Sequence, residues 1–259
     1  LGRSILGSVQ SITDLTSEQM SAYHAQQYMA GNLTLVITGN ADWKQVLELA
    51  HQFCDHWPAG KTERPMDEAT PADHAQIIIE KGIQQQHIMQ LAPAPSAQDL
   101  LRLPAEILAI IIGDDSNSRL YWKLVDTGLA ESAELGYNEY DGSGTWLTYL
   151  CSDPELTESN RQRIQEIYDD VNQNGVTLEE LVRAKNKLAS RLVLRSERPM
   201  GRLSSLGGNW VYRQEYVSVA DDLKLLNSVT LEGIQKLLKK YPLGYSTTAA
   251  VGPMTSVAD

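Results

Sequence analysis

The sequence predicts an α+β fold in which helices pack on a mostly antiparallel sheet. Both strand-like and amphipathic helical periodicities occur along the 259 residues. Two strand-like segments frame a Gly-rich turn, as in a β-hairpin. A helix–break–strand–glycine pattern near the N-terminus also occurs near the C-terminus. This indicates one complete unit preceded by the tail of a related unit.

The N-terminal tail is predicted to contain two helices separated by a strand. Thr16 and Gln19 fit a capping box, which predicts a helix that continues to about Met29. Residues 33–38 alternate and predict a strand that ends at Gly39. Asp42 then suits the N-cap of an amphipathic helix. The domains predicted from this pattern are a tail at 1–60, a linker at 61–74, where Pro, Thr and charges gather, and a complete unit at 75–259.

The complete unit begins with two strands and ends with a strand. The proline pair at Pro93 and Pro95 is expected to end the second strand, and Ser96 is expected to begin a long helix. Thr177 and Glu180 form another capping box, whose helical stretch is interrupted at Pro199. The predicted strands are 75–81, 86–92, 130–140, 145–151 and 245–251, and the predicted helices are 96–112, 118–126, 156–172, 177–198, 199–212, 220–227 and 231–240.

The internal repeat is the main evidence for two related units. Thr16 corresponds to Thr230, which lies 214 residues further on, and Gly39 corresponds to Gly252 at an offset of 213. Two copies of a unit of that length cannot fit into 259 residues. The chain is therefore expected to hold one copy and the end of another.

Composition and charge exclude several classes of function. The formal net charge is -11, which disfavours nucleic-acid binding because phosphates repel an acidic surface. No run of 18 apolar residues is present, so no membrane span is predicted. The two cysteines, Cys54 and Cys151, are too few for a disulfide scaffold or a structural zinc knuckle and are expected to be small, half-buried side chains.

Three ordered motifs resemble the insulinase/pitrilysin family of zinc metallopeptidases of bacterial type. The first resembles the stretch that closes the first half of these enzymes, and the others resemble helices of the second half. The motifs are Leu1-Gly2-Arg3-Ser4-Ile5-Leu6-Gly7 with Tyr23, Tyr28 and Gly39-Asn40; Asn117-Ser118-Arg119-Leu120-Tyr121 with Gly128-Leu129-Ala130; and Gly175-Val176-Thr177-Leu178-Glu179-Glu180-Leu181 with Ala184-Lys185-Asn186.

The resemblance implies two homologous α+β half-domains that close on a peptide. The family holds its zinc in the first half, on a His-x-x-Glu-His helix and a later Glu. This sequence has no such motif, and the third ligand is expected upstream of Leu1, so no metal or catalytic residue is predicted here. The five histidines all fall outside the motif: His24, His51, His56, His74 and His87. Zinc is expected in the parent protein if that protein is active.

The resemblance also implies an Arg and a Tyr that hold the substrate near the Gly-Leu-Ala turn. The corresponding positions here are Val125 and Glu131, so that clamp does not carry over. Arg119, Tyr137 and Tyr140 are the residues predicted to replace it as substrate-binding groups.

Other polar clusters favour structural roles. Glu48, His51 and Cys54 have helical spacing, but Cys54 belongs to the apolar stripe and the others to the polar face, so no metal site is predicted. Asp114 and Asp115 are expected in turn and N-cap roles. The aromatic residues of the predicted hairpin could line a peptide groove or occupy its two faces; they are Tyr137, Tyr140, Trp146 and Tyr149.

Two functional hypotheses follow. The parent protein is a zinc endopeptidase and this chain forms its substrate-chamber half, which is inactive alone. Alternatively, the parent is a non-catalytic member of the family that serves as a scaffold or partner subunit. The expected partners are a peptide substrate and the first half-domain or a homologous subunit. A homodimer is also possible, because a strand at 33–38 would have unpaired edges. Bacterial cytoplasm and periplasm both remain open as compartments.

Overall fold

A computed structural model of the chain describes residues 4–62, 75–245 and 247–256. The chain divides into two compact units, residues 1–65 and 66–259, each of which is described by itself. None of the helices in the described part of the chain is long and apolar enough to cross a membrane.

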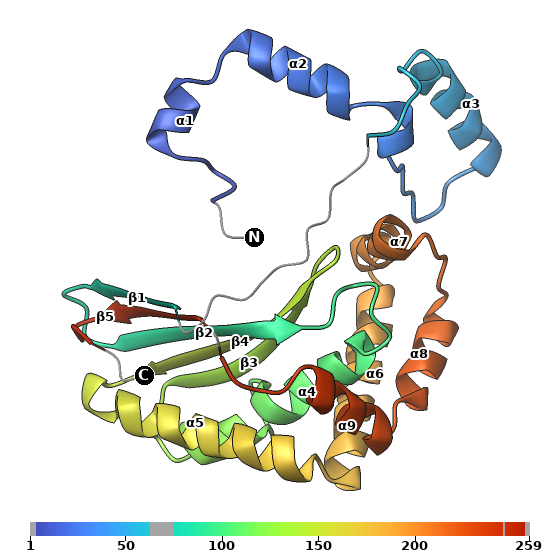
Figure 1. Cartoon of the computed structure of the whole chain (residues 1–259). Helices are drawn as coiled ribbons and strands as arrows, with labels where there is room; N and C mark the ends of the chain where they lie inside the picture. The colour runs from blue at the N-terminus through green and yellow to red at the C-terminus, as the bar shows by residue number, and fades with distance from the viewer. Residues whose placement is uncertain (1–3, 63–74, 246, 257–259) are drawn as a thin grey trace. The chain divides into compact units, whose positions relative to one another are not determined.

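The first unit consists of short helices joined by extended segments (Figure 1). Its elements are α1 (Val9–Thr13), α2 (Ser17–Gln27), the 3-10 turn η1 (Ala30–Asn32) and α3 (Trp43–Cys54). The predicted capping box of α2 is confirmed. The Gln19 backbone amide donates a hydrogen bond to the Thr16 hydroxyl, and the Thr16 backbone amide donates one to Oε1 of Gln19. The predicted Asp42 cap of α3 is also confirmed.

The predicted strand at 33–38 is wrong for the structure described. Residues 33–38 form no strand, and the backbone around Ala30 and Gly31 instead bonds to Pro58 and Gly60. The physical reason is that a strand needs a neighbouring strand for its amides and carbonyls, and none of the strands in the described part of the chain pairs with this segment. Leu35 is 69% exposed, so the side chains of this segment also lack cover.

The second unit is built on a five-stranded sheet in the order β1-β5-β2-β4-β3. The strands are β1 (Ala75–Glu80), β2 (Gln86–Ala94), β3 (Ser132–Glu139), β4 (Gly144–Ser152) and β5 (Thr247–Gly252). All neighbouring pairs are antiparallel except β1 and β5, which run parallel with Ile77 opposite Ala249. The predicted mostly antiparallel sheet is therefore confirmed.

Helices cover one face of this sheet (Figure 1). The helical elements of this unit are α4 (Arg102–Gly113), the π-helical turn η2 (Tyr121–Val125), α5 (Pro154–Asn174), α6 (Leu178–Ser196), α7 (Pro199–Arg213), α8 (Val219–Ser228) and α9 (Leu231–Lys240). Of these, α4, η2 and α5 pack on the strands, α6 and α9 pack on α4, and α7 and α8 pack on α6. The core lies between these helices and the sheet. Its largest fully buried side chains include Trp146, Tyr168, Ile88 and Ile107.

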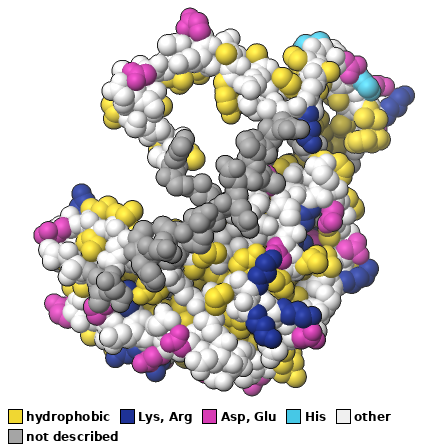
Figure 2. Space-filling view, in the orientation of Figure 1, with side chains coloured by type: hydrophobic (Ala, Val, Ile, Leu, Met, Phe, Trp, Pro, Cys, Tyr) yellow, Lys and Arg dark blue, Asp and Glu magenta, His cyan; other side chains and the backbone are white. Residues whose placement is uncertain are grey.

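The opposite face of the sheet is open within this unit. Alternate residues of β2 are buried, and those between them are partly or fully exposed. The side chains exposed on this face include Ile77 and Ile79 of β1 and Met89 of β2, which are 57%, 45% and 41% exposed. Figure 2 shows hydrophobic side chains at the surface where β1 and β5 lie.

Two predicted element boundaries near Pro93 and Pro95 need correction. β2 continues through Pro93 to Ala94, because β5 pairs with β2 only as far as Leu91 and leaves one edge of β2 free beyond that point. A proline on a free edge removes no ladder hydrogen bond. The helix expected from Ser96 begins at Arg102, since residues 97–101 form turns.

Candidate functional site

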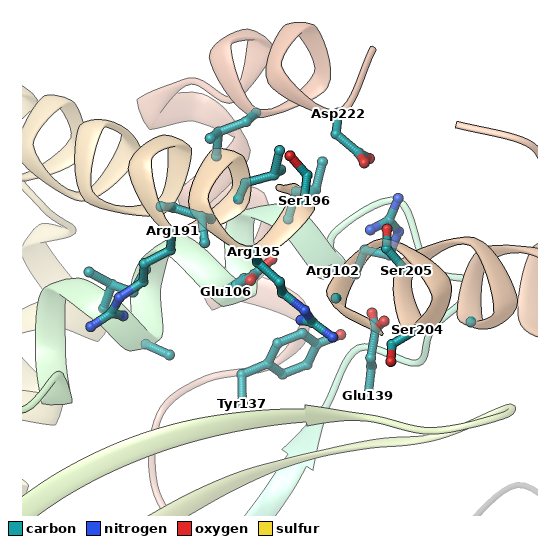
Figure 3. Close-up of a pocket in the computed structure, with 18 of the residues that line it drawn as sticks. Arg102, Glu106, Tyr137, Glu139, Arg191, Arg195, Ser196, Ser204, Ser205 and Asp222 are labelled. Carbon is teal, nitrogen blue, oxygen red and sulfur yellow. The ribbon is translucent and has the colours of Figure 1, made fainter. Parts of the chain in front are cut away.

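A cavity of about 1170 Å³, open to solvent, lies in the second unit between α4, α6, α7, α8 and β3 (Figure 3). Its apolar lining includes Leu103, Ile110, Leu188 and Leu226. Charged side chains from all five elements face the same space. The described residues that line it include Ser196, Ser204 and Ser205 but neither histidine nor cysteine.

Arginines contribute positive charge to this cavity, and those of the described lining are Arg102, Arg191, Arg195, Arg198, Arg202 and Arg213. Arg195 lies in the last turn of α6 and Arg213 in the last turn of α7, where the negative end of each helix dipole favours a cation. Arg102 is the first residue of α4, where the dipole disfavours a cation by about 0.3–1 kcal/mol. A residue that conflicts with the local preference indicates a role outside the helix itself.

Carboxyl groups share the cavity with these arginines, and those of the described lining are Glu106, Asp114, Asp115, Glu134, Glu139 and Asp222. Glu106 is open to the water of the cavity but enclosed by its walls, so desolvation raises its pKa and the charge of Glu139 raises it further. Desolvation also raises the pKa of Asp222 above its ordinary value, against the opposing influence of Arg102. Both shifts make these two carboxyl groups easier to protonate than ordinary ones.

Two buried donors in the cavity have no hydrogen-bond acceptor within the described part of the chain. They are Nδ2 of Asn209 and Nε of Arg213, one helical turn apart on α7. Arg213 is otherwise held, because its Nη1 donates to the Ala97 carbonyl at 3.2 Å and its Nη2 donates to Oδ1 of Asn209. The nearest carboxylates, Glu139 and Glu215, lie 4.0 and 3.9 Å from Arg213 nitrogens, beyond hydrogen-bond distance.

Of the residues predicted to bind substrate, Tyr137 lies in this cavity and the other two do not. The Tyr137 hydroxyl donates to the Pro95 carbonyl at 2.8 Å, and desolvation raises its pKa far above the ordinary value. Figure 3 shows Arg195 pointing toward Tyr137. Tyr140 lies just beyond β3, where its backbone bonds to Ser143 and Ala97.

Arg119 lies in a separate ion-pair network. Its Nε and Nη2 donate to Glu180 at 2.8 and 3.0 Å, and its Nη1 donates to Asp170 at 2.7 Å. These contacts join the segment before η2 to α5 and to the N-terminus of α6. The structure therefore does not bring Arg119 together with Tyr137 and Tyr140 in one site.

The structure also places the acidic and aromatic residues for which the sequence suggested turn, N-cap or peptide-groove roles. Asp114 is not an N-cap but follows α4 and pairs with Lys187 and Arg191 of α6. Trp146 is 1% exposed, so it belongs to the core and not to a peptide groove. Tyr149 lies on the open sheet face, where its hydroxyl bonds to Nδ1 of His87 at 2.9 Å.

Most of the cavity was missed by sequence reasoning. Arg102, Glu106, Arg195 and Asp222 lie on three helices and up to 120 residues apart. The one available signal was Arg102 at a helix start, and the predicted start at Ser96 concealed it.

The positions of the His, Cys, Asp and Glu side chains show whether the described residues could bind a metal. No group of three His, Cys, Asp or Glu side chains capable of holding a metal occurs in the ranges that the structure describes. His51 has an exposed carboxylate partner, Asp55, at 3.1 Å, and Cys54 is partly buried. The described residues therefore contain no group that fits a zinc site.

Comparison with known proteins identifies one family. A family model described as "Peptidase M16 inactive domain" matches residues 14–188. An uncharacterized zinc protease of Rickettsia felis is 24% identical over 98% of this chain and 61% of its own length. An uncharacterized zinc protease of Mycobacterium leprae is 23% identical over 99% of this chain and 59% of its own length. The chain thus spans about three fifths of the length of these relatives.

Solved structures show the same fold. The peptidase M16 inactive domain from Pseudomonas fluorescens matches with a TM-score of 0.87 and 21% identity, over 97% of this chain and 61% of that one. A protease from Helicobacter pylori matches with a TM-score of 0.81 and 16% identity, over 95% of this chain and 61% of that one. At these identities the likeness establishes the fold alone.

Proposed function

The chain belongs to the peptidase M16 family, and we propose that it is the part of a two-half zinc-dependent endopeptidase that carries no zinc motif. The single observation that carries this proposal is the match of residues 14–188 to the inactive domain of the family. The relatives from Rickettsia felis and Mycobacterium leprae are named as zinc proteases, which supports the proposal that the parent protein binds zinc.

The internal repeat supports a division into a tail at 1–60, a linker at 61–74 and a half-domain at 75–259. Thr230 caps α9 by accepting from the Gly233 amide, as Thr16 does for α2 with Gln19. Gly39 and Gly252 both have positive φ, 119° and 159°. By this correspondence, residues 33–38 are the counterpart of β5, which lies inside a sheet with a strand on each side.

In this proposal the half-domain supplies peptide-contacting surface. The open sheet face offers exposed apolar side chains such as Ile77, Ile79 and Met89, which suit the apolar residues of an unfolded peptide. Tyr137 in the cavity and Tyr140 beside it remain candidate peptide contacts. Arg119 is a weaker candidate because its guanidinium already has carboxylate partners.

One observation favours the alternative, in which the parent is a scaffold or partner subunit without catalysis. At the two positions where the family resemblance implies Arg and Tyr, Val125 packs against the core and Glu131 accepts a hydrogen bond from Gln85. Neither can donate to a substrate carbonyl or to the transition state.

The test is to purify the parent protein with its upstream region and measure its zinc content and its cleavage of an unfolded peptide mixture. We expect about one zinc per chain and cleavage that a chelator abolishes, as for a single catalytic site. A parent protein without zinc and without cleavage would contradict the peptidase proposal and would support the alternative of a non-catalytic scaffold or partner subunit.

A further inference from the structure

We propose that the cavity between α4, α6, α7, α8 and β3 binds a peptide through a carboxylate, either its C-terminal group or an acidic side chain. Taking the ligand to be a peptide rests on the proposed function. The choice of a carboxylate rests on the cavity itself.

The first reason is that the cavity presents cations without partners. Neither the Arg102 nor the Arg195 side chain has a hydrogen bond or an ion pair among the residues described, although both line the cavity. The chain has 33 acidic and 22 basic residues, so carboxylates are abundant and cations are scarce. Two guanidinium groups left free in one cavity are suited to bidentate binding of an external carboxylate.

The second reason is the pair of buried donors on α7. Asn209 is 8% exposed and the Arg213 side chain is 10% exposed, yet Nδ2 and Nε, respectively, lack an acceptor within the described chain. A buried donor without an acceptor costs about 1–3 kcal/mol. A carboxylate brings two acceptor oxygens, so one such group can satisfy donors that are left open here.

The third reason concerns the acids of the cavity. Glu106 and Asp222 repel an anion when they are ionised, and enclosure by the cavity walls raises the pKa of both, which weakens that repulsion. Asp114 and Asp115, which also line the cavity, pair with Lys187 and Arg191. A cationic ligand would meet the guanidinium groups of Arg102, Arg195 and Arg213 instead. The unpaired guanidinium groups and the open donors of α7 therefore favour an anionic group, although the lining also holds carboxylates.

The fourth reason is size and apolar lining. A volume of about 1170 Å³ exceeds the usual small-molecule pocket of roughly 300–1,000 Å³. Leu103, Ile110 and Leu188 line the cavity beside the charged groups. A peptide segment with apolar side chains next to its carboxylate uses both parts of this surface.

The test measures binding of short peptides to the full 259-residue chain by fluorescence anisotropy with an uncharged fluorophore at the peptide N-terminus. Four six-residue peptides of alanine and leucine end in Glu or Gln, each with a free or an amidated C-terminus. A fifth, amidated, ends in Lys. We expect saturable binding with Kd below about 1 mM for at least one carboxylate-bearing peptide and none for the amidated Gln peptide. Binding of the free-acid Gln peptide identifies the C-terminal group, and binding of the amidated Glu peptide identifies the side chain.

Variants test the location of the bound group and the sign of its charge. Arg195→Gln is expected to weaken binding about tenfold, because a bidentate charge-assisted contact is lost. Arg183→Gln removes an exposed cation from the same helix, outside this cavity, and is expected to change Kd by less than about twofold. Glu106→Gln is expected to leave binding unchanged or to strengthen it, because glutamine removes the negative charge that Glu106 presents to the ligand when it is ionised. Circular dichroism and thermal midpoints establish that each variant is folded.

Three results would overturn the inference. They are no binding of any carboxylate-bearing peptide, equal effects of Arg195→Gln and Arg183→Gln, or preference for the Lys peptide with weaker binding in Glu106→Gln. The assay uses neither zinc nor turnover, so its outcome is independent of the proposed peptidase activity. An active parent with no peptide bound here would reject this inference alone.

Discussion

Replacement of Arg119 by methionine is expected to destabilise the chain. The Arg119 side chain is 22% exposed and Glu180 is 15% exposed, so their ion pair is partly shielded from solvent. Arg119 is bound to Glu180 through two nitrogens and to Asp170 through a third, and it also reaches the Gly175 carbonyl at 3.4 Å. Methionine keeps much of the aliphatic packing and removes the charge.

The expected loss follows from these contacts. A hydrogen bond between charged groups contributes about 1.5–3 kcal/mol. Asp170 is 52% exposed, so that solvent-screened pair adds at most about 1 kcal/mol. Glu180 keeps its bonds to the Thr177 amide and hydroxyl, which limits the damage to the α6 cap. We therefore expect Arg119→Met to lower the free energy of unfolding by about 2–3 kcal/mol.

The pH dependence has a definite sign. Desolvation alone would raise the pKa of Glu180, but hydrogen bonds from Arg119 and from the Thr177 backbone hold it below its ordinary value. A lowered folded pKa contributes stability above the unfolded value, about 4.3, and that stability is lost as pH falls through the folded value. The difference between wild type and Arg119→Met should therefore shrink below about pH 4.

Urea unfolding followed by circular dichroism measures this difference. The matched control is Arg183→Met, whose pair with Glu179 is long, 3.8 Å, and exposed, so we expect a change within about 0.5 kcal/mol. An unchanged free energy of unfolding in Arg119→Met, together with weaker peptide binding, would refute the structural role. It would instead support the substrate-binding role predicted from the sequence.

Four further outcomes are expected. Elemental analysis after dialysis against a weak chelator should find no stoichiometric zinc in the chain, since no metal-binding group of three side chains occurs in its described parts; one tightly held zinc would contradict this. The chain alone should not cleave an unfolded peptide mixture, and chelator-sensitive cleavage by a pure sample would contradict this expectation. Residues 33–38 alternate like a strand but form none in the described structure, so the tail should dock on the second unit or pair with another chain; light scattering on the full chain and on one starting near Thr70 tests this, and a monodisperse monomer with a protease-sensitive tail would show that it does neither. Gly113→Ala should cost at least about 2 kcal/mol in urea unfolding, because a Cβ there would lie 1.9 Å from the Leu135 amide nitrogen, and an unchanged midpoint would contradict that packing.

Local signals in the sequence determined the boundaries of several elements. The capping box at Thr177 and Glu180 starts α6 where predicted, because both of its bonds form within one turn of chain. Pro199 begins α7 at its first position, and β3 and β4 form a hairpin around Gly142, which has positive φ. Each of these features depends only on residues that are close in sequence. The resemblance to the metallopeptidase family rested on such local motifs and was confirmed by the family match.

Elements that depend on distant partners could not be predicted in the same way. Leu33 to Thr38 alternates like a strand, but a strand forms only where another strand supplies its hydrogen bonds. Pro93 suggested the end of β2, whereas the position where β5 stops pairing decides whether a proline is tolerated there.

The candidate site itself depends on tertiary structure. Arg102, Glu106 and Arg195 carry no shared motif, and α4, α6 and β3 bring them around one cavity only after the core has formed. Likewise, Arg119 was identified from the sequence by its charge, and its partners Glu180 and Asp170 lie more than fifty residues away. Sequence determined which residue types were available and where helices begin. Packing determined which charges were neutralised and which were left to face a ligand, because ion pairing depends on distances between side chains that only the folded chain specifies.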